Sequence, residues 1–280
     1  MTDISEIKSR IKRIEDTQKV TKAMYLIASA KYRKAKESFQ QFSGYCQAVE
    51  TQITSLSDSL NADNCRFISN GSDKKACLVI TSDKGLAGDY NKSALRKADE
   101  FLSENPDSLI YVIGEKGKTY FENKKVKIEK YFEEDYTDLS AQKTKSLSDY
   151  FCDLFLKNEI GSLNIVYTGT KDGIRTGVEI KQILPLELKP DNKAKTDDFE
   201  FIPDKETLIG NIVPLYVDSV FHSVILQSVF SEQSARMVAM DSANSNAGDM
   251  LDELNLQYNH SRQNSITQEI TEFSGERKSL

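Results

Sequence analysis

Residues 4–60 carry one unbroken heptad pattern, in which apolar side chains recur at alternating steps of three and four residues. Of its seventeen positions only Gln18 and Thr21 are polar, and no proline occurs before Pro106. The positions are Ile4, Ile7, Ile11, Ile14, Gln18, Thr21, Tyr25, Ala28, Tyr32, Ala35, Phe39, Phe42, Cys46, Val49, Ile53, Leu56 and Leu60. The pattern predicts a single helix of the coiled-coil type, about 85 Å long at 1.5 Å per residue.

A second long stretch without proline runs from about Leu215 to Phe273. Its apolar residues recur at helical spacing, at Val220, Val224, Met237, Met240, Ala247, Leu251, Leu254, Tyr258, Ile266, Ile270 and Phe273. Neither helix can bury its apolar stripe alone. We therefore expect the two helices to pair as an antiparallel coiled coil.

The middle of the chain alternates short apolar runs with amphipathic stretches. Strands are predicted at 76–81, 109–113, 163–168 and 178–184, and helices at 92–104, from Thr119 onward and at 140–157, with GEKGK as a turn and 189–200 as a loop. Strands that alternate with helices favour a mainly parallel sheet of the Rossmann type. The predicted fold class is α/β, with a coiled-coil helix at 1–60, a Rossmann-like domain at 75–200 and a second coiled-coil helix at 208–276.

Charge is distributed unevenly over the 280 residues, whose net charge is −6. Residues 1–36 hold ten Lys and Arg against four acids, so this segment is +6 and the remainder is −12. The basic residues of interest on the N-terminal helix are Lys8, Arg10, Lys12, Arg13, Lys19 and Lys22. Such a helix could bind nucleic acid, anionic lipid or an acidic protein surface, or be a solvated face. The aromatic residues lie on the apolar stripe, which weakens the case for nucleic acid.

Few residues suggest catalysis, a cofactor or a metal. GEKGKT lacks the first glycine of a phosphate-binding loop, because Val112 occupies that position. SDKGLAGDYN follows a strand but lacks the full dinucleotide spacing. We expect His222 and His260 to have surface or helix-packing roles. The four cysteines show no metal spacing, which predicts reduced thiols in a cytosolic protein. No apolar run approaches the roughly 20 residues of a membrane span, and the N-terminus does not resemble a signal peptide.

Four blocks of the sequence are informative, and the C-terminal one, a run of uncommon polar residues inside a predicted helix, is very specific. The four blocks are SEQSARMVAM (231–240), LQYNHSRQNSITQEITE (256–272), SDKGLAGDYN (82–91) and IKSRIKRIEDTQKVTKAM (7–24). With these blocks the chain resembles the γ subunits of F-type rotary ATP synthases over essentially its whole length. Glu276 and Arg277 stand where that family has Gly-Ala, and Tyr25 stands where it commonly has lysine.

The resemblance implies a central rotor shaft that couples ion flow through the membrane sector to ATP synthesis or hydrolysis in the catalytic hexamer. It implies a non-catalytic subunit without a cofactor, whose partners are the α and β subunits, subunit ε and the c-ring. It implies no nucleic acid and no membrane span of its own, and a peripheral location at the cytoplasmic face of a bacterial plasma membrane. It further suggests that the residues contacting the catalytic subunits are Arg236, Arg262, Gln263, Thr267 and Glu269.

Two other classes of function remain open from the residues alone. One is a Rossmann-type enzyme or small-molecule-binding protein that uses the loop at Gly85–Gly88. The other is a coiled-coil scaffold or a basic-helix nucleic-acid binder. The enzyme interpretation lacks an acid–base pair and a complete phosphate loop. The scaffold interpretation leaves the ITQE block unexplained.

Overall fold

The computed structural model describes residues 4–56, 65–138, 140–171, 175–186 and 205–276. The chain forms two compact units. The first contains residues 1–29 and 236–280, and the second contains residues 30–235. The long helices α1 (Ile4–Leu56) and α5 (Lys205–Glu276) each contribute to both units. The loop expected at 189–200 lies outside the described residues.

The second unit is built on a five-stranded sheet with the order β3-β2-β1-β4-β5. Its elements follow the chain as β1 (Lys75–Ile80), α2 (Tyr90–Glu104), β2 (Leu109–Ile113), α3 (Glu115–Asn123), β3 (Ile128–Phe132), a 3-10 turn η2 (Tyr136–Asp138), α4 (Ala141–Leu156), β4 (Ser162–Lys171) and β5 (Arg175–Leu184). Strands β3, β2, β1 and β4 are parallel, and β5 pairs with β4 in the antiparallel sense. The predicted α/β class and mainly parallel sheet are confirmed.

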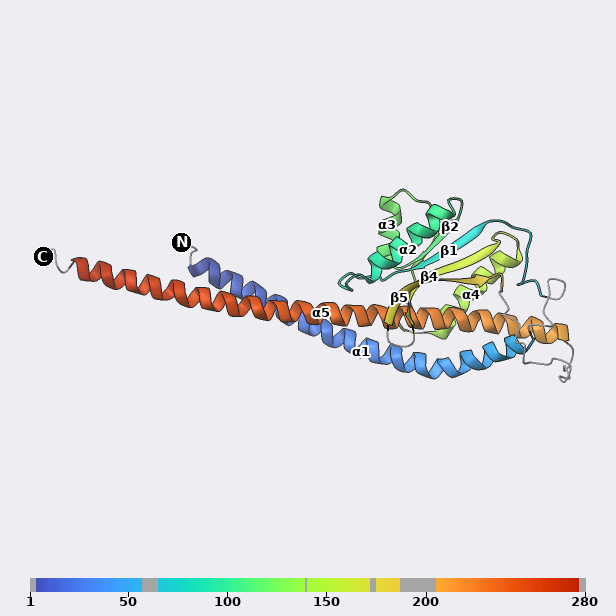
Figure 1. Cartoon of the computed structure of the whole chain (residues 1–280), viewed down its shortest axis with the longest axis horizontal. Helices are drawn as coiled ribbons and strands as arrows, with labels where there is room; N and C mark the ends of the chain where they lie inside the picture. Colours follow the sequence, from blue (N-terminus) through green and yellow to red (C-terminus); the bar gives the residue numbers. More distant parts are fainter. Residues whose placement is uncertain (1–3, 57–64, 139, 172–174, 187–204, 277–280) are drawn as a thin grey trace. The chain divides into compact units, whose positions relative to one another are not determined.

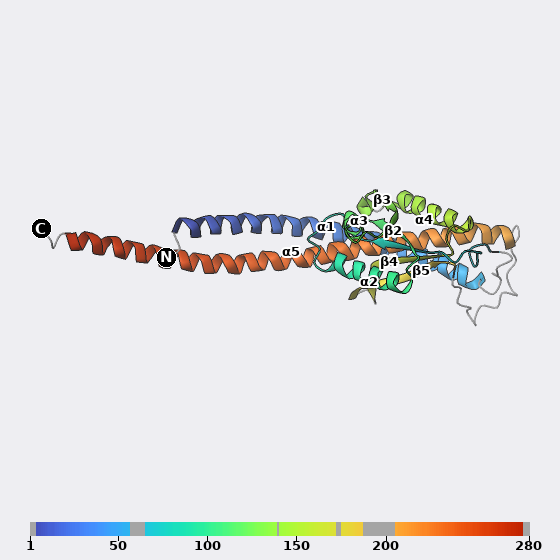
Figure 2. The same cartoon turned by 90° about the horizontal axis from the view of Figure 1, so that it is seen from above.

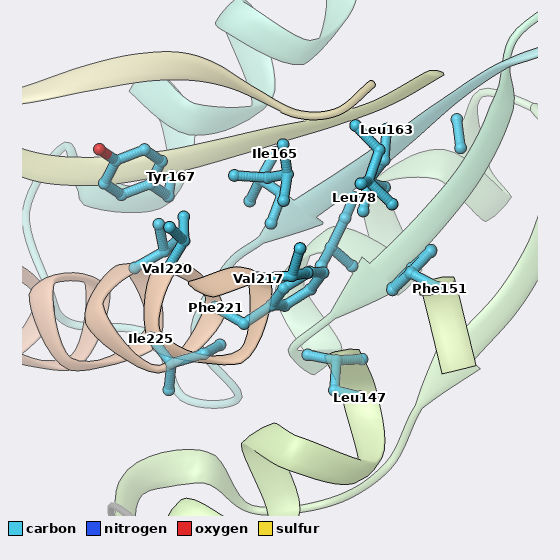
Figure 3. Close-up of a cluster of buried hydrophobic side chains, with 14 of the residues drawn as sticks. Leu78, Leu147, Phe151, Leu163, Ile165, Tyr167, Val217, Val220, Phe221 and Ile225 are labelled. Carbon is cyan, nitrogen blue, oxygen red and sulfur yellow. The ribbon is translucent and has the colours of Figure 1, made fainter. Parts of the chain in front are cut away.

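Each face of the sheet is covered by helices (Figure 1). On one face, Leu95 of α2 and Phe121 of α3 pack on Cys77, Val79 and Val112. Because strand residues alternate between faces, the neighbouring strand residues point to the other face. There they meet α4 and the first half of α5 in the larger core (Figure 3), which includes Leu78, Ile165, Phe151, Val217 and Phe221.

The heptad positions of α1 are the positions at which that helix is buried. Every heptad position from Ile4 to Ile53 is buried or half-buried, and the buried residues of α1 for which side-chain exposure is described all lie on it. Within the second unit, Tyr32 stacks on Phe230 with ring centroids 4.8 Å apart, and Phe42 meets His222 edge-on at 4.5 Å. Residues ascend on α1 as their partners descend on α5, so the predicted antiparallel pairing is confirmed.

Three details of the prediction are wrong. Helix α3 begins at Glu115 and not at Thr119, so GEKGK forms its first turn and not a separate turn. Strand β3 was not predicted, because its sequence IEKYF has two adjacent charged residues and so no continuous apolar run, as is possible at the edge of the sheet. Helix α5 begins at Lys205 and passes through Pro214. The proline removes one N–H, but Gly210 and Pro214 are both exposed, so water can satisfy the freed carbonyl.

Helix α5 also passes a composition test for membrane spans. Its most apolar window of 18 residues, within Gly210–Thr271, has a mean hydropathy of 1.4, although polar residues interrupt it and no continuous apolar run reaches that length. Of that window, 61% is buried inside the protein. In the second unit, the apolar side chains of α5 pack against the sheet and α4 (Figure 3), which accounts for their hydrophobicity without a bilayer.

His222 has the helix-packing role expected from the sequence. The residue is 8% exposed, and its Nδ1 atom lies 2.8 Å from the Thr144 hydroxyl of α4. Burial lowers the pKa of His222, while the nearby Asp218 carboxylate acts in the opposite direction. His260, by contrast, is exposed.

We predict that His222→Asn flattens the pH dependence of stability below about pH 6.5, the pKa of an unperturbed histidine. Because the native pKa of His222 is lowered, the unfolded chain binds the proton first as pH falls, and the wild-type chain loses stability through this window. Asp218, whose pKa is raised by burial, acts in the opposite direction in both proteins. Urea unfolding at several pH values measures the difference, and equal slopes for the two proteins would show that His222 is not the group responsible.

Two glycines provide a matched test of the fold. Gly114 has φ +94°, and a Cβ atom there would clash with the carbonyl of Thr81, the residue after β1, whereas a Cβ on Gly44 in α1 would meet nothing within 4 Å. We expect Gly114→Ala to lower the free energy of unfolding by more than about 1 kcal/mol. Gly44→Ala should raise it by about 0.5–1 kcal/mol through helix propensity. Thermal unfolding of the two variants tests the pair, and a stable Gly114→Ala protein would contradict the geometry.

Candidate functional site

The C-terminal end of α5 extends beyond the helix with which it pairs. In the first unit the Lys8 ammonium lies 5.7 Å from the centroid of the Tyr258 ring, and the Gln18 side-chain amide donates to the Asn244 carbonyl at 3.5 Å. Helix α1 begins at Ile4, four residues before Lys8, which brings its end level with about Arg262. Figures 1 and 2 both show α5 continuing past that point. Its last turns, from Arg262 to Glu276, are called the tip below.

Four of the five predicted contact residues lie on the tip: Arg262, Gln263, Thr267 and Glu269. All four are exposed in the isolated chain. A helix advances about 100° per residue, so Arg262 and Glu269 lie within about 20° of each other around the axis. Gln263 and Thr267 form a second pair, centred roughly 120° away from Arg262. The four residues therefore present two polar faces that can meet different partners.

Two isoleucines occupy the arc between these polar pairs. Ile266 is 45% exposed and Ile270 is 63% exposed. The sequence interpretation placed both residues in the buried stripe of α5, which is wrong because α1 ends before it reaches them. The tip thus carries an apolar ridge flanked by polar side chains. The spacing of apolar residues alone could not reveal this ridge, because the same spacing continues from the part of α5 that pairs with α1 into the tip.

Arg236 is separated from the other predicted contact residues. It is 8% exposed, and it precedes Arg262 by 26 positions, or about 39 Å of helix. The isolated chain therefore does not offer its guanidinium to a partner in the way it offers that of Arg262. The structure does not bring Arg236 into the group on the tip.

The basic residues of α1 lie on its solvent-facing sides. Lys8, Arg10, Lys12, Arg13, Lys19 and Lys22 are all exposed. Lys19 pairs with Asp16 at 3.2 Å, and no other residue of the six forms an ion pair within the described ranges. Five of these charges are thus available for a partner, and at physiological salt they are screened beyond about 8 Å.

The edge of the sheet where α/β folds commonly bind ligands is filled by α5. At the carboxyl ends of β1 and β2 the cavity measures only about 30 Å³ and is lined in part by Ile225, Ser228 and Val229 of α5. This volume holds about one water molecule. A nucleotide needs roughly 300 Å³ or more. The cavity between α5 and the carboxyl ends of β1 and β2 therefore has no room for one.

The glycine-containing segments at this edge have structural roles. The Asn91 carboxamide oxygen accepts from the Ser82 backbone N–H at 2.9 Å, which closes the SDKGLAGDYN loop onto its own helix. Gly117 is buried, and a Cβ atom there would lie 2.8 Å from both the Thr81 hydroxyl and a Val112 methyl. Gly117 allows α3 to pack closely on β2 and on Thr81, which explains this glycine without a phosphate ligand.

The four cysteines are free thiols. Burial raises the pKa of Cys77 and of Cys152 to about 12 in each case. At neutral pH both are protonated, and only the thiolate is a strong nucleophile or metal ligand. Among the described residues no group of three or more His, Cys, Asp or Glu side chains is arranged to hold a metal ion.

Comparison with known proteins decides the family. A family model described as ATP synthase matches residues 3–280. The ATP synthase gamma chain of Clostridium novyi is 38% identical over 271 residues, covering 96% of this chain and 95% of the relative. The gamma chain of Staphylococcus carnosus is 34% identical over 282 residues, covering 98% of each. The chain belongs to the ATP synthase gamma chain family.

Solved structures of ATP synthases share the gamma-chain fold. The rotor of the Euglena gracilis mitochondrial ATP synthase gives a TM-score of 0.66 at 17% identity, covering 94% of this chain and 98% of the other. The central stalk of the Tetrahymena thermophila mitochondrial enzyme gives 0.58 at 20% identity, covering 80% and 99%. At these identities the likeness concerns the fold alone.

We predict that the tip of this gamma chain contributes little to its own stability. Ile270→Ala should change the free energy of unfolding by less than about 0.5 kcal/mol, as exposed positions usually do. Leu254→Ala, at a position 5% exposed on the same helix, should cost about 2 kcal/mol or more. Urea unfolding followed by helical circular dichroism compares the two variants. Equal losses would mean that the tip is packed in solution.

Proposed function

We propose that this gamma chain is the central rotor shaft of an F-type ATP synthase. It would couple ion flow through the membrane sector to ATP synthesis or hydrolysis in the catalytic hexamer. The observation that carries the proposal is family membership over the whole chain. The exposed tip adds to it, because a helix end with an apolar ridge and two polar faces has contact surface available for a surrounding protein.

The structure suggests how the shaft would transmit torque. The apolar seam between α1 and α5 stiffens the helix pair, because bending it would open buried contacts. On the tip, Arg262, Gln263, Thr267 and Glu269 would contact successive catalytic subunits during rotation. The Thr267 hydroxyl already donates to the Gln263 carbonyl at 2.8 Å, so Thr267 would present mainly its oxygen and methyl group. We leave Arg236 out of this contact set because it is buried.

The basic residues of α1 would supply weaker contacts. Exposed charges attract an acidic surface through a screened field that falls off over about 8 Å at physiological salt. Contacts of this kind form and break with low barriers, which suits a surface that must pass several subunits in turn. Lys8, Arg10, Lys12, Arg13 and Lys22 are the residues that this role would use.

The proposed partners are the α and β subunits of the hexamer, subunit ε and the c-ring. The chain itself would perform no ATP chemistry, and its role needs no cofactor and no nucleic acid. The three functional parts would be the N-terminal helix at 1–60, the α/β domain at 75–200 and the C-terminal helix at 208–276. The paired arms would serve the hexamer, and the α/β domain would serve ε and the c-ring.

A gamma chain is part of a membrane-associated ATP synthase. We further propose that this one lies peripherally at the cytoplasmic face of a bacterial plasma membrane. The support is that relatives in Clostridium and Staphylococcus, which are bacteria, cover nearly the whole chain at 34–38% identity. Fractionation of cells into membrane and soluble extracts, with and without washing in low-salt buffer, would locate it.

We predict that Arg262→Ala combined with Gln263→Ala separates stability from function. Both side chains are exposed, so the loss of stability in the isolated chain should be about 0.5 kcal/mol each at most. In the assembled complex the same groups would be partly desolvated, where removing one partner of a charged contact costs about 2–5 kcal/mol. We expect an unchanged melting temperature and an ATPase turnover lowered at least about tenfold, since 1.4 kcal/mol corresponds to that factor.

The matched control replaces the same residue types away from the tip. Arg33 and Gln47 are exposed on α1 in the second unit, and Arg33→Ala with Gln47→Ala should leave turnover unchanged. Assembly of every variant is verified by size-exclusion chromatography before turnover is measured. Wild-type turnover in an intact complex carrying the Arg262 and Gln263 changes would remove the tip from the contact surface.

A further inference from the structure

A cleft of about 610 Å³ lies between α2 and α3, on the face of the sheet opposite α4. Its lining is mainly apolar, and Leu95 and Tyr120 contribute to it. The cleft lies wholly within the second unit. It belongs neither to the tip nor to the basic part of α1. Its volume suits a few side chains, since small-ligand sites measure about 300–1,000 Å³.

Three cations surround this apolar lining: Lys92 and Arg96 of α2 and Lys116 of α3. All three are exposed, and none forms an ion pair with another described residue. The cleft therefore carries a local excess of positive charge in a chain whose net charge is −6.

The acids near the cleft already have partners. Asp99, the one acid in the lining, accepts from the Lys124 ammonium at 2.6 Å and from the Tyr120 hydroxyl. Glu100 pairs with Lys97 at 2.7 Å. These carboxylates bond chiefly to Lys124, Tyr120 and Lys97, and Arg96 adds only a weaker charge interaction with Glu100. None of the three lining cations is held in an ion pair with a described residue.

We propose that this cleft docks an acidic amphipathic segment of another subunit of the ATP synthase complex. The occupant must bring apolar side chains, because the lining is apolar, and carboxylates at its flanks, because Lys92, Arg96 and Lys116 are unpaired. An amphipathic helix meets both demands, with an apolar anchor flanked by acids three or four residues away. The proposal rests on the proposed function only in taking its partner from the ATP synthase.

Other occupants match the site less well. A small anion would gain nothing from the apolar lining. Single-stranded nucleic acid needs a free aromatic face for stacking. The ring of Tyr120 already carries the Lys124 ammonium 4.7 Å from its centroid, and its hydroxyl is bound to Asp99. The observations therefore favour a protein segment.

Photocrosslinking in the purified, intact complex tests the proposal. Thr119, exposed in the lining, is replaced by photoreactive p-benzoylphenylalanine, and adducts are sequenced by mass spectrometry. We expect an adduct with a peptide of another subunit that carries at least two Asp or Glu residues within about one helical turn of an apolar residue. No adduct, an adduct with lipid or with a second copy of this chain, or a peptide without such acids would overturn the proposal.

Charge reversal supplies the second arm. Lys92→Glu, Arg96→Glu and Lys116→Glu together should lower the adduct yield at least tenfold. Lys74→Glu, Lys145→Glu and Lys157→Glu make the same charge change at exposed positions outside the cleft and should leave it within twofold. Equal yields in the two triple variants would contradict the role of the lining cations. The first crosslinking experiment uses a chain in which Lys92, Arg96 and Lys116 are unchanged. It therefore still tests the docking site if the triple variant assembles poorly.

The test is independent of the rotor assignment. ATPase turnover of the photolabelled complex is measured before illumination and depends on the shaft and its tip. An absent adduct in a complex that turns over normally would remove the docking site and leave the rotor proposal intact. If the adduct forms but the tip substitutions leave turnover unchanged, the docking site stands and the proposed role of the tip is contradicted.

Discussion

The apolar seam between α1 and α5 is the interaction on which the rest of this gamma chain depends. In each unit the two helices meet in antiparallel register, through Phe42 and His222 in one and through Lys8 and Tyr258 in the other. Small residues bring the helices close, since Ala28 and Ala35 are fully buried. The same seam determines where pairing stops, and α5 alone continues into an exposed tip. The pairing of α1 with α5 therefore determines both the stiffness of the helix pair and the extent of the exposed surface on the tip.

Of the two polar positions of the heptad, Gln18 favours one register of that seam, whereas Thr21 bonds within its own helix. Gln18 reaches across to the Asn244 carbonyl, and Thr21, 8% exposed, turns its hydroxyl back to the Gln18 carbonyl. A buried polar group is satisfied in one alignment and unsatisfied in its neighbours, so such positions specify register at some cost in stability. A shaft needs a fixed register because a slip of one helix along the other would displace the tip.

The spacing of apolar residues predicted the elements that keep the same packing partner along their length. It failed where an element loses its partner or lies at the edge of the sheet. The heptad of α1 matched its burial because one partner follows it throughout. The prediction that the apolar stripe of α5 is buried was extended too far, to Ile266 and Ile270, because the sequence alone does not reveal where α1 ends along α5. Strand β3 was not predicted because an edge strand is partly exposed to solvent and its sequence is therefore partly polar. The early start of α3 depends on Gly114 and Gly117, whose close approach to Thr81 is a tertiary contact. Of the predicted site, the four tip residues and the basic face of α1 are exposed, as the proposed role requires, whereas Arg236 is buried.

Rotation of the shaft inside the assembled complex can be observed directly. A gold bead can be attached to a single new cysteine at Lys127, which is exposed beside β3, in a chain whose four native cysteines are replaced. The catalytic hexamer is fixed to a surface, ATP is added, and the bead is followed by dark-field microscopy. We expect continuous rotation in one direction that stops when ATP is removed. Immobile beads in complexes that hydrolyse ATP at the wild-type rate would contradict the proposed rotor role.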